Sequence, residues 1–261
     1  MPGATMPSDL PELSEPAAPA KAAPDVLAPQ MSRWTAAWGL LILAGGLVAY
    51  YRAGHAICDW WFAPGRPDEF RQTAFYFSLL LVLAVLLTFV LVGWRDLRHL
   101  GFSRENITAQ LSWAVFAVAC TYAFEILAVV PYWLWFRPPG DVGNPVAKTL
   151  FAAAATEDYV GAVVLVILIG AAAEELLFRG LLLRYLNGLF RGPWLAILIS
   201  AAIFGLAHLR SDYFNALIAF WMGTVLGTIY VRRASLLTVV VAHFLFNFSN
   251  LLLVPAIWST G

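Results

Sequence analysis

Two adjacent glutamates and an arginine interrupt an apolar stretch, GAAAEELLFRG, at residues 170–180. In the centre of a membrane-spanning helix each such charge costs about 2.5–3.5 kcal/mol unless it is paired or hydrated. Glu175 and Arg179 lie four residues apart with the acid first, which is the favourable order for an ion pair on one helical face. Glu174 points about 100° away from Glu175 on a helix, so it cannot share that arginine equally well and needs another partner.

Two later stretches offer such partners. The chain has four histidines, and two of them, His208 and His243, fall inside long apolar blocks. Phe204 comes four residues before His208 in FGLAH, and Asn247 comes four residues after His243 in HFLFN, so each pair shares a helical face. An imidazole and a carboxamide on one face can direct two N–H donors at a developing oxyanion, each worth about 2.7–4 kcal/mol. Taken singly, each histidine would instead be interpreted as a hydrogen-bonded polar group in a helix bundle.

The composition is that of a membrane protein. Of the 261 residues, 61% are hydrophobic and only 12% are charged, and the mean hydropathy is +0.75, whereas soluble domains carry about 25% charged residues. The formal net charge of +0 gives no indication of a nucleic-acid partner. The two cysteines, Cys58 and Cys120, have no C-x-x-C spacing, so neither a redox motif nor a disulfide framework is indicated.

Apolar blocks of about 20 residues, the length that crosses a bilayer as a helix, follow one another from Trp34 onward. The fold class is therefore all-α, a polytopic transmembrane helix bundle with a polar intramembrane cavity. We place seven spans at residues 34–52, 74–94, 111–136, 159–190, 193–210, 213–231 and 235–257. The fourth is too long for one straight crossing, and NPVAKTLFAAAA before it could form an interfacial or re-entrant helix, which would make eight elements.

Two further patterns describe the helices themselves. Tyr50 and Tyr51, at the end of the first predicted span, are typical of the aromatic belt at a membrane interface. The stretch GTVLG, residues 223–227, has the small-xxx-small spacing that lets two helix backbones approach closely. Both patterns indicate helix ends or packing and need no functional explanation.

The predicted spans bring the polar groups to one depth. If the fourth and fifth spans turn at about Arg191, Glu174 and His208 lie the same number of residues from that turn. If the last two spans turn on the same face, the depth of His243 and Asn247 is similar. At about 1.5 Å per residue, the four side chains fall about 15–25 Å from that face. We therefore predict a polar layer contributed by three helices around a water-filled cavity.

Three motifs occur in the same order as in one known family. They are E-E-x-x-x-R from Glu174, F-x-x-x-H from Phe204 and H-x-x-x-N from His243. Together they resemble the CPBP family, the CAAX proteases and bacteriocin-processing enzymes also called Abi, which includes the type II CAAX prenyl endopeptidases. The resemblance covers about residues 159–257, and the first three spans carry no motif that we can assign.

The resemblance implies an intramembrane glutamic endopeptidase, a CAAX-protease-like hydrolase that uses no cofactor and no serine or cysteine nucleophile. By this resemblance Glu174 is the general base that activates water, and His208 holds that water. His243 and Asn247 are the donors that stabilise the tetrahedral oxyanion. The implied supporting residues, which organise the site without doing the chemistry, are Glu175, Arg179 and Phe204.

Two alternatives stay open at this point. Carboxylates and two histidines at one depth could hold Zn²⁺ in a metalloprotease, although the sequence has no H-E-x-x-H motif. A non-catalytic immunity or scaffold protein, or a proton-coupled carrier, could use the same buried groups. A carrier would favour an internal repeat, and none is visible.

The chain divides into three predicted parts. Residues 1–33 are rich in Ala and Pro and predict a disordered tail. Residues 34–136 predict N-terminal transmembrane helices, and residues 159–257 predict the catalytic core. Glu125, in the third span, is predicted to be a packed polar residue that could instead line the cavity.

The predicted location is the inner membrane of a bacterial cell, as a multi-pass protein. Arginine and lysine are more frequent in the loops on the N-terminal side, which predicts a cytoplasmic N-terminus. The partners are the lipid bilayer and a membrane-associated peptide or protein substrate. Candidate substrates are a bacteriocin leader, a peptide pheromone or a C-terminal sorting segment.

Overall fold

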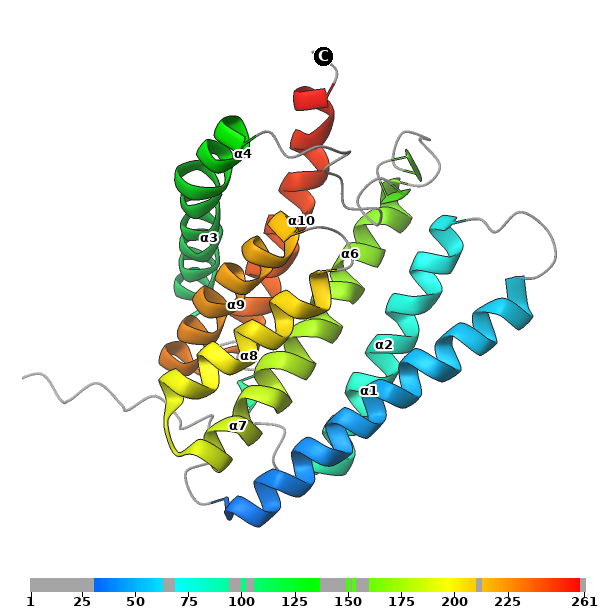
Figure 1. The fold of residues 1–261 in the computed structure, drawn as a ribbon, viewed down its shortest axis with the longest axis vertical. Helices are drawn as coiled ribbons and strands as arrows, with labels where there is room; N and C mark the ends of the chain where they lie inside the picture. The colour runs from blue at the N-terminus through cyan, green and yellow to red at the C-terminus, as the bar shows by residue number, and fades with distance from the viewer. Residues whose placement is uncertain are drawn as a thin grey trace, which may run out of the picture.

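A computed structural model of the chain describes residues 31–62, 69–93, 100–101, 106–136, 149–150, 152–153, 160–209 and 213–258. Within these ranges the regular elements are helices and no strand occurs, so the predicted all-α class is confirmed. The α-helices, drawn in Figure 1, are α1 (Arg33–Phe62), α2 (Glu69–Leu91), α3 (Ile107–Phe124), α4 (Val130–Phe136), α6 (Val160–Glu175), α7 (Leu183–Phe190), α8 (Pro193–His208), α9 (Tyr213–Arg233) and α10 (Leu236–Trp258). Two π-helical segments, η2 (Glu125–Val129) and η4 (Leu176–Leu182), join α3 to α4 and α6 to α7.

The predicted spans all correspond to helices. Five are long and apolar enough to cross a membrane: Arg33–Gly54, Glu69–Leu91, Ile107–Tyr132, Val160–Phe190 and Tyr213–Arg233. Two more, Pro193–His208 and Leu236–Leu252, are shorter apolar helices. The long fourth span is one unbroken helical element of 31 residues, with η4 in place of a break. The predicted tail up to residue 30, and most of the NPVAKTLFAAAA segment, lie outside the described residues.

The first helix is longer than predicted. It continues to Phe62 instead of ending at residue 52, so Tyr50 lies inside a helix and not at its end. The Tyr50 side chain is part-buried, and its hydroxyl donates a hydrogen bond to the backbone carbonyl of Tyr76 at 3.1 Å. Tyr50 lies four residues before the end of the candidate membrane span Arg33–Gly54, so its interpretation as an interfacial aromatic stays a prediction.

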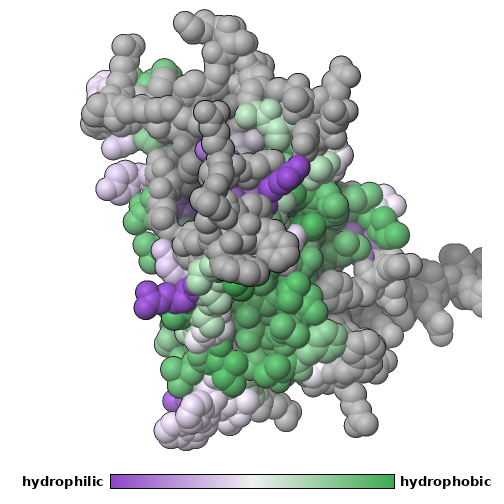
Figure 2. Space-filling view, turned by 90° about the vertical axis from the view of Figure 1, so that its right-hand side faces the viewer, coloured by the Kyte–Doolittle hydropathy of each residue, from purple (hydrophilic) through white to green (hydrophobic). Residues whose placement is uncertain are grey.

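The surface has the polarity expected of a protein in lipid. Figure 2 shows a broad hydrophobic area over the middle of one face, with paler and more polar residues at its lower end. On α2, for example, Leu86 and Val90 are exposed by 57% and 71%. Monomeric soluble proteins rarely expose large contiguous apolar areas, so this surface is consistent with contact with the bilayer.

Small residues bring α8 and α9 close together, as their adjacent ribbons in Figure 1 indicate. A Cβ atom on Gly223 would lie 3.0 Å from Cα of Ala201, and one on Gly227 would lie 3.2 Å from a methyl group of Ile197. The packing role predicted for GTVLG is thus confirmed. The close approach matters for the site, because it brings the backbone of α9 within reach of side chains from the α6–α7 element.

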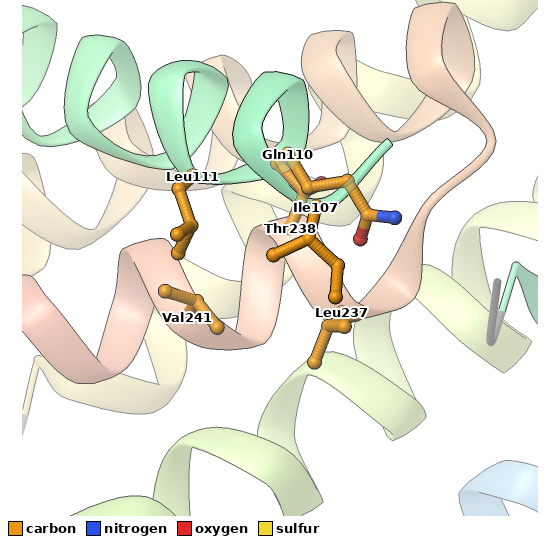
Figure 3. A pocket seen from close by; sticks show the side chains of 6 residues that line it. All are labelled: Ile107, Gln110, Leu111, Leu237, Thr238 and Val241. Carbon is orange, nitrogen blue, oxygen red and sulfur yellow. The ribbon is translucent and has the colours of Figure 1, made fainter. Parts of the chain in front are cut away.

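A hydrogen-bonded anchor holds the start of α10 against α3. Ser235 Oγ donates to Gln110 Oε1 at 3.0 Å, and it accepts from the backbone N–H of Thr238 at 3.2 Å, which caps the helix. The small pocket of Figure 3 lies beside this anchor and is otherwise lined by apolar side chains, Ile107, Leu111, Leu237 and Val241. The pocket does not include the charged residues of the motifs, and a packing irregularity beside the anchor accounts for it.

Candidate active site

A buried ion pair forms the centre of the charged cluster. Glu175 is 0% exposed and Arg179 is 1% exposed, and Arg179 Nη1 donates to Glu175 Oε1 at 2.7 Å. The predicted pair at a spacing of four is therefore present. The helix continues as the π-segment η4 directly after Glu175, and such segments occur frequently at functional sites.

The same arginine joins three helices. Its Nη2 donates to the backbone carbonyl of Gly223 on α9 at 3.3 Å. Its guanidinium carbon lies 4.9 Å from the ring centroid of Phe204 on α8, within the range of a cation–π contact. The Phe204 side chain is 0% exposed. Arg179 therefore holds η4, α8 and α9 in one arrangement.

His243 lies between the two glutamates. Its Nδ1 is 2.8 Å from Glu175 Oε1, and because an ionised carboxylate only accepts hydrogen bonds, Nδ1 carries the proton. Its Nε2 is 3.8 Å from Glu174 Oε2, which is too long for a direct hydrogen bond and is a separation at which a bridging water should be considered. The ring is only 2% exposed, so Glu175 fixes its orientation inside the bundle.

The two neighbouring carboxylates have different surroundings. The side chain of Glu174 is 17% exposed, whereas that of Glu175 is 0% exposed. Glu175 is thus enclosed by Arg179 and His243, and Glu174 remains accessible from outside the protein. This difference agrees with the prediction that the two side chains point in different directions and that Glu174 has a separate partner.

His208 is held in the same manner as His243. Its Nδ1 is 2.8 Å from the backbone carbonyl of Phe204, so Nδ1 donates and the Nε2 of a neutral ring is left as an acceptor. Its ring centroid lies 4.6 Å from that of Phe204, which in turn lies 5.9 Å from that of His243. Phe204 therefore separates the two imidazoles and packs against both of them.

Asn247 lies one helical turn after His243 on α10 and is half-buried. No other residue described in the structure forms a hydrogen bond with its carboxamide. The structure therefore places Glu174, Glu175, Arg179, Phe204, His208 and His243 in one connected cluster. Asn247 follows His243 by one helical turn, and among the described residues it forms no hydrogen bond with this cluster.

Tyr50 is a neighbour of the site that the motifs did not indicate. Near one end of the bundle, Gly39 of α1 packs on Tyr185 of α7, and the two helices run in opposite directions (Figure 1). Counting the same number of residues along both from that contact leads to Tyr50 and Glu174. The two side chains also interact electrostatically. Only the register between two distant helices reveals this proximity.

Possible metal ligands are few in the cluster. Among the residues described by the structure, no group of three His, Cys, Asp or Glu side chains is arranged to hold a metal ion. His243 Nδ1 lies 2.8 Å from Glu175 Oε1, and its Nε2 lies 3.8 Å from Glu174 Oε2. The arrangement is one of hydrogen-bonded acids and bases in an apolar bundle.

A comparison with protein families finds a match for the part of the chain that carries the motifs. Residues 156–249 match the family described as type II CAAX prenyl endopeptidase Rce1-like. No curated protein and no solved structure matches the chain. The matched range contains all the residues of the three motifs, and the resemblance to the CAAX protease and CPBP family is confirmed.

Proposed function

Starting from a chain whose residues 156–249 are Rce1-like, we propose that it is an intramembrane glutamic endopeptidase that cleaves a membrane-associated peptide or protein. The family match supports an intramembrane CAAX protease kind of function. The mechanism rests on one observation. The accessible carboxylate of Glu174 faces Nε2 of His243, whose Nδ1 is held by the enclosed carboxylate of Glu175.

Glu174 is proposed as the general base. A water molecule that donates one hydrogen to Glu174 and the other to His208 Nε2 has its lone pair free to attack a peptide carbonyl carbon. The attack transfers a proton to Glu174 and forms a tetrahedral oxyanion. The C–N bond then breaks, and the proton passes from Glu174 to the leaving amine. A positioned general base contributes about 10²–10⁴-fold to such a reaction.

His243 and Asn247 are proposed as the oxyanion donors. The Asn247 carboxamide supplies N–H groups that the described part of the protein does not use. Since Nδ1 of His243 already donates to Glu175, its Nε2 donates only when the ring carries both protons. The carboxylates on either side offset that positive charge. Each donor aimed at an oxyanion contributes about 2.7–4 kcal/mol in measured cases.

Substitution of Glu174 tests this mechanism. The full chain is reconstituted in phospholipid vesicles with a library of membrane-tethered peptides, and cleavage is followed by mass spectrometry. We expect Glu174→Gln to lower the rate by about 100-fold or more. Glu69→Gln is a matched control. Glu69 is the first residue of α2 and is exposed, and its Oε2 accepts a hydrogen bond from the Thr149 hydroxyl. Wild-type cleavage by Glu174→Gln would show that Glu174 is not the base.

The two alternatives have separate tests. A zinc protease would contain stoichiometric metal after purification and lose both metal and activity on chelation, which is measured by elemental analysis beside the cleavage assay. A carrier or scaffold protein would cleave no member of the library. Comparing the C-terminal peptides of cells with and without this protein would then identify the natural substrate of an active protease.

A further inference from the structure

The polar face of α10 does not end at Asn247. At about 100° per residue, His243, Asn247 and Asn250 fall within about 60° of one another on the helix. Asn250 lies about 10 Å from His243 along the helix axis, at about 1.5 Å per residue. A row of polar side chains therefore leads away from the proposed reaction centre within an otherwise apolar helix.

Tyr122 of α3 contacts the far end of this row. Its hydroxyl donates to Asn250 Oδ1 at 2.8 Å and is 2.7 Å from Ser249 Oγ. The ring packs on Phe246, with centroids 5.1 Å apart. Because Oδ1 of Asn250 is held by the tyrosine, the orientation of its carboxamide is fixed, and this part of α10 is tied to α3.

Glu125 follows Tyr122 by less than one turn and is the first residue of the π-segment η2. Its Oε2 atom is buried and has no hydrogen-bond partner, and its carboxylate interacts electrostatically with the Tyr122 hydroxyl. An unpaired charge within a membrane span is costly and marks a functional site by default. In contrast, Glu175 has Arg179 at 2.7 Å. Glu125 has no such cation among the residues that the structure describes.

Contacts between helices place Glu125 beyond Asn250 along the polar row. The helices α3 and α10 run in the same direction, because Gln110 bonds Ser235 near their starts and Tyr122 bonds Asn250 further along, and Glu125 follows Tyr122. Trp221 of α9 donates from Nε1 to the carbonyl of Cys120 at 3.1 Å, and its ring stacks on Phe124 at 4.8 Å. Trp221 is two residues from Gly223, whose carbonyl binds Arg179. Five neighbouring helices form a closed ring. In it α8 packs on α9, α9 on α3, α3 on α10 and α10 on α6, and η4, which continues α6, packs on α8. Glu125 thus belongs to the side of this ring opposite the α6 helix that carries Glu174.

We propose that Tyr122, Glu125 and Asn250 form a second subsite, which binds a basic side chain of the substrate two or three residues from the cleaved bond. This inference rests on the proposed function. An extended peptide covers about 3.3 Å per residue, so the separation of about 10 Å between His243 and Asn250 corresponds to that spacing. A lysine or arginine side chain would compensate the charge of Glu125 and would also give its buried oxygen a hydrogen bond. A neutral donor would supply the hydrogen bond without compensating the charge.

A peptide series tests this subsite. Membrane-tethered peptides carry a single lysine or, at the same position, a methionine, scanned through four positions on each side of the cleaved bond. For wild-type protein we expect kcat/KM to favour lysine over methionine by about tenfold or more at one position, as for a charge-assisted hydrogen bond. In Glu125→Gln this ratio falls to about one. Glu69→Gln changes an exposed glutamate of α2 that is not part of the subsite, and it should keep the wild-type ratio. An unchanged ratio in Glu125→Gln, or no lysine preference in the wild type, overturns the inference.

Two additions keep the result independent of folding and of the proposed chemistry. If Glu125→Gln does not fold, as judged by thermal unfolding in detergent, Tyr122→Phe is used in its place and should also lower the ratio. The second addition is a binding measurement that needs no cleavage. Fluorescent lysine and methionine peptides are bound to Glu174→Gln protein, with and without the Glu125→Gln substitution, and their affinities are compared. Preferred binding of the lysine peptide that requires Glu125 supports the subsite even where the glutamic mechanism fails, and equal binding of both peptides contradicts it.

Discussion

At the scale of single residues, the main feature is the unequal treatment of two adjacent carboxylates. Glu175 is enclosed by a guanidinium and an imidazole, while Glu174 is partly exposed and faces the free nitrogen of that imidazole. The sequence spacing of four predicted the Glu175–Arg179 pair correctly, because both residues lie on one helix. It did not predict that His243 bonds Glu175, because that contact depends on how α10 is rotated against α6.

Removing the charge of Arg179 should separate the stabilising role of the pair from its role in the reaction. Arg179→Met leaves Glu175 buried without its cation, and we expect a loss of about 3–5 kcal/mol in the free energy of unfolding. The double variant Glu175→Gln with Arg179→Met removes both charges and should recover most of that loss. It should remain impaired in cleavage, because His243 no longer donates to a carboxylate.

Thermal unfolding and peptide cleavage, measured side by side in the same detergent, check this prediction. A double variant that regains full activity together with stability would show that Glu175 only balances the arginine. A single variant as stable as the wild type would show that the buried pair contributes no net stability.

At the scale of helices, close packing sets the position of the aromatic and imidazole groups. Besides the GTVLG contacts, Gly205 lies between Phe204 and His208 on the sequence and packs on α9, where a Cβ atom would come within 2.8 Å of the Ala216 carbonyl oxygen. A backbone atom cannot move aside as a flexible side chain can. The spacing of α8 from α9 therefore depends on this glycine.

Gly205→Ala should push α8 away from α9 and displace its neighbours Phe204 and His208. We expect a loss of about 1–3 kcal/mol in stability, typical of overpacking, together with a lower kcat. Gly161→Ala is the matched control, because no atom lies within 4 Å of a Cβ atom built on Gly161 of α6. There the change should be neutral or stabilise the helix by up to about 1 kcal/mol.

The measurement is thermal unfolding combined with the cleavage assay used for the glutamate variants. Equal effects of the two glycine substitutions would contradict a special role for the α8–α9 contact.

At the scale of the whole molecule, the N-terminal helices contribute to the site although they lie outside the family match. Tyr50 of α1 reaches the neighbourhood of Glu174, and Phe77 of α2 packs directly on Gly170, one turn before it. The three motifs therefore lie in a bundle whose wall is completed by α1 and α2, as their position beside α6 and α7 in Figure 1 indicates.

The direction of the bundle in the membrane remains a prediction from the loop charges. With seven spans and a cytoplasmic N-terminus, α9 begins outside the cytoplasm and ends inside it. Tyr213, at the start of α9, is 82% exposed, and Arg232 near its end is also exposed. In a background with Cys58 and Cys120 replaced by serine, Tyr213→Cys should react with a membrane-impermeant thiol reagent on intact cells. Arg232→Cys should react only after lysis, and the reverse pattern would show the opposite orientation.

The sequence by itself determined the class of the fold, the approximate spans, the Glu175–Arg179 pair and the set of polar residues in the three motifs. These follow from composition and from spacing along single helices, where length and face are set by residue number alone. Only the tertiary structure decided that His243 bridges towards both glutamates, that Phe204 packs between two imidazoles, and that Tyr50 and the Tyr122–Asn250 contact adjoin the site. Such contacts join helices far apart in the chain, and they depend on the rotation and tilt of each helix, which packing between side chains sets.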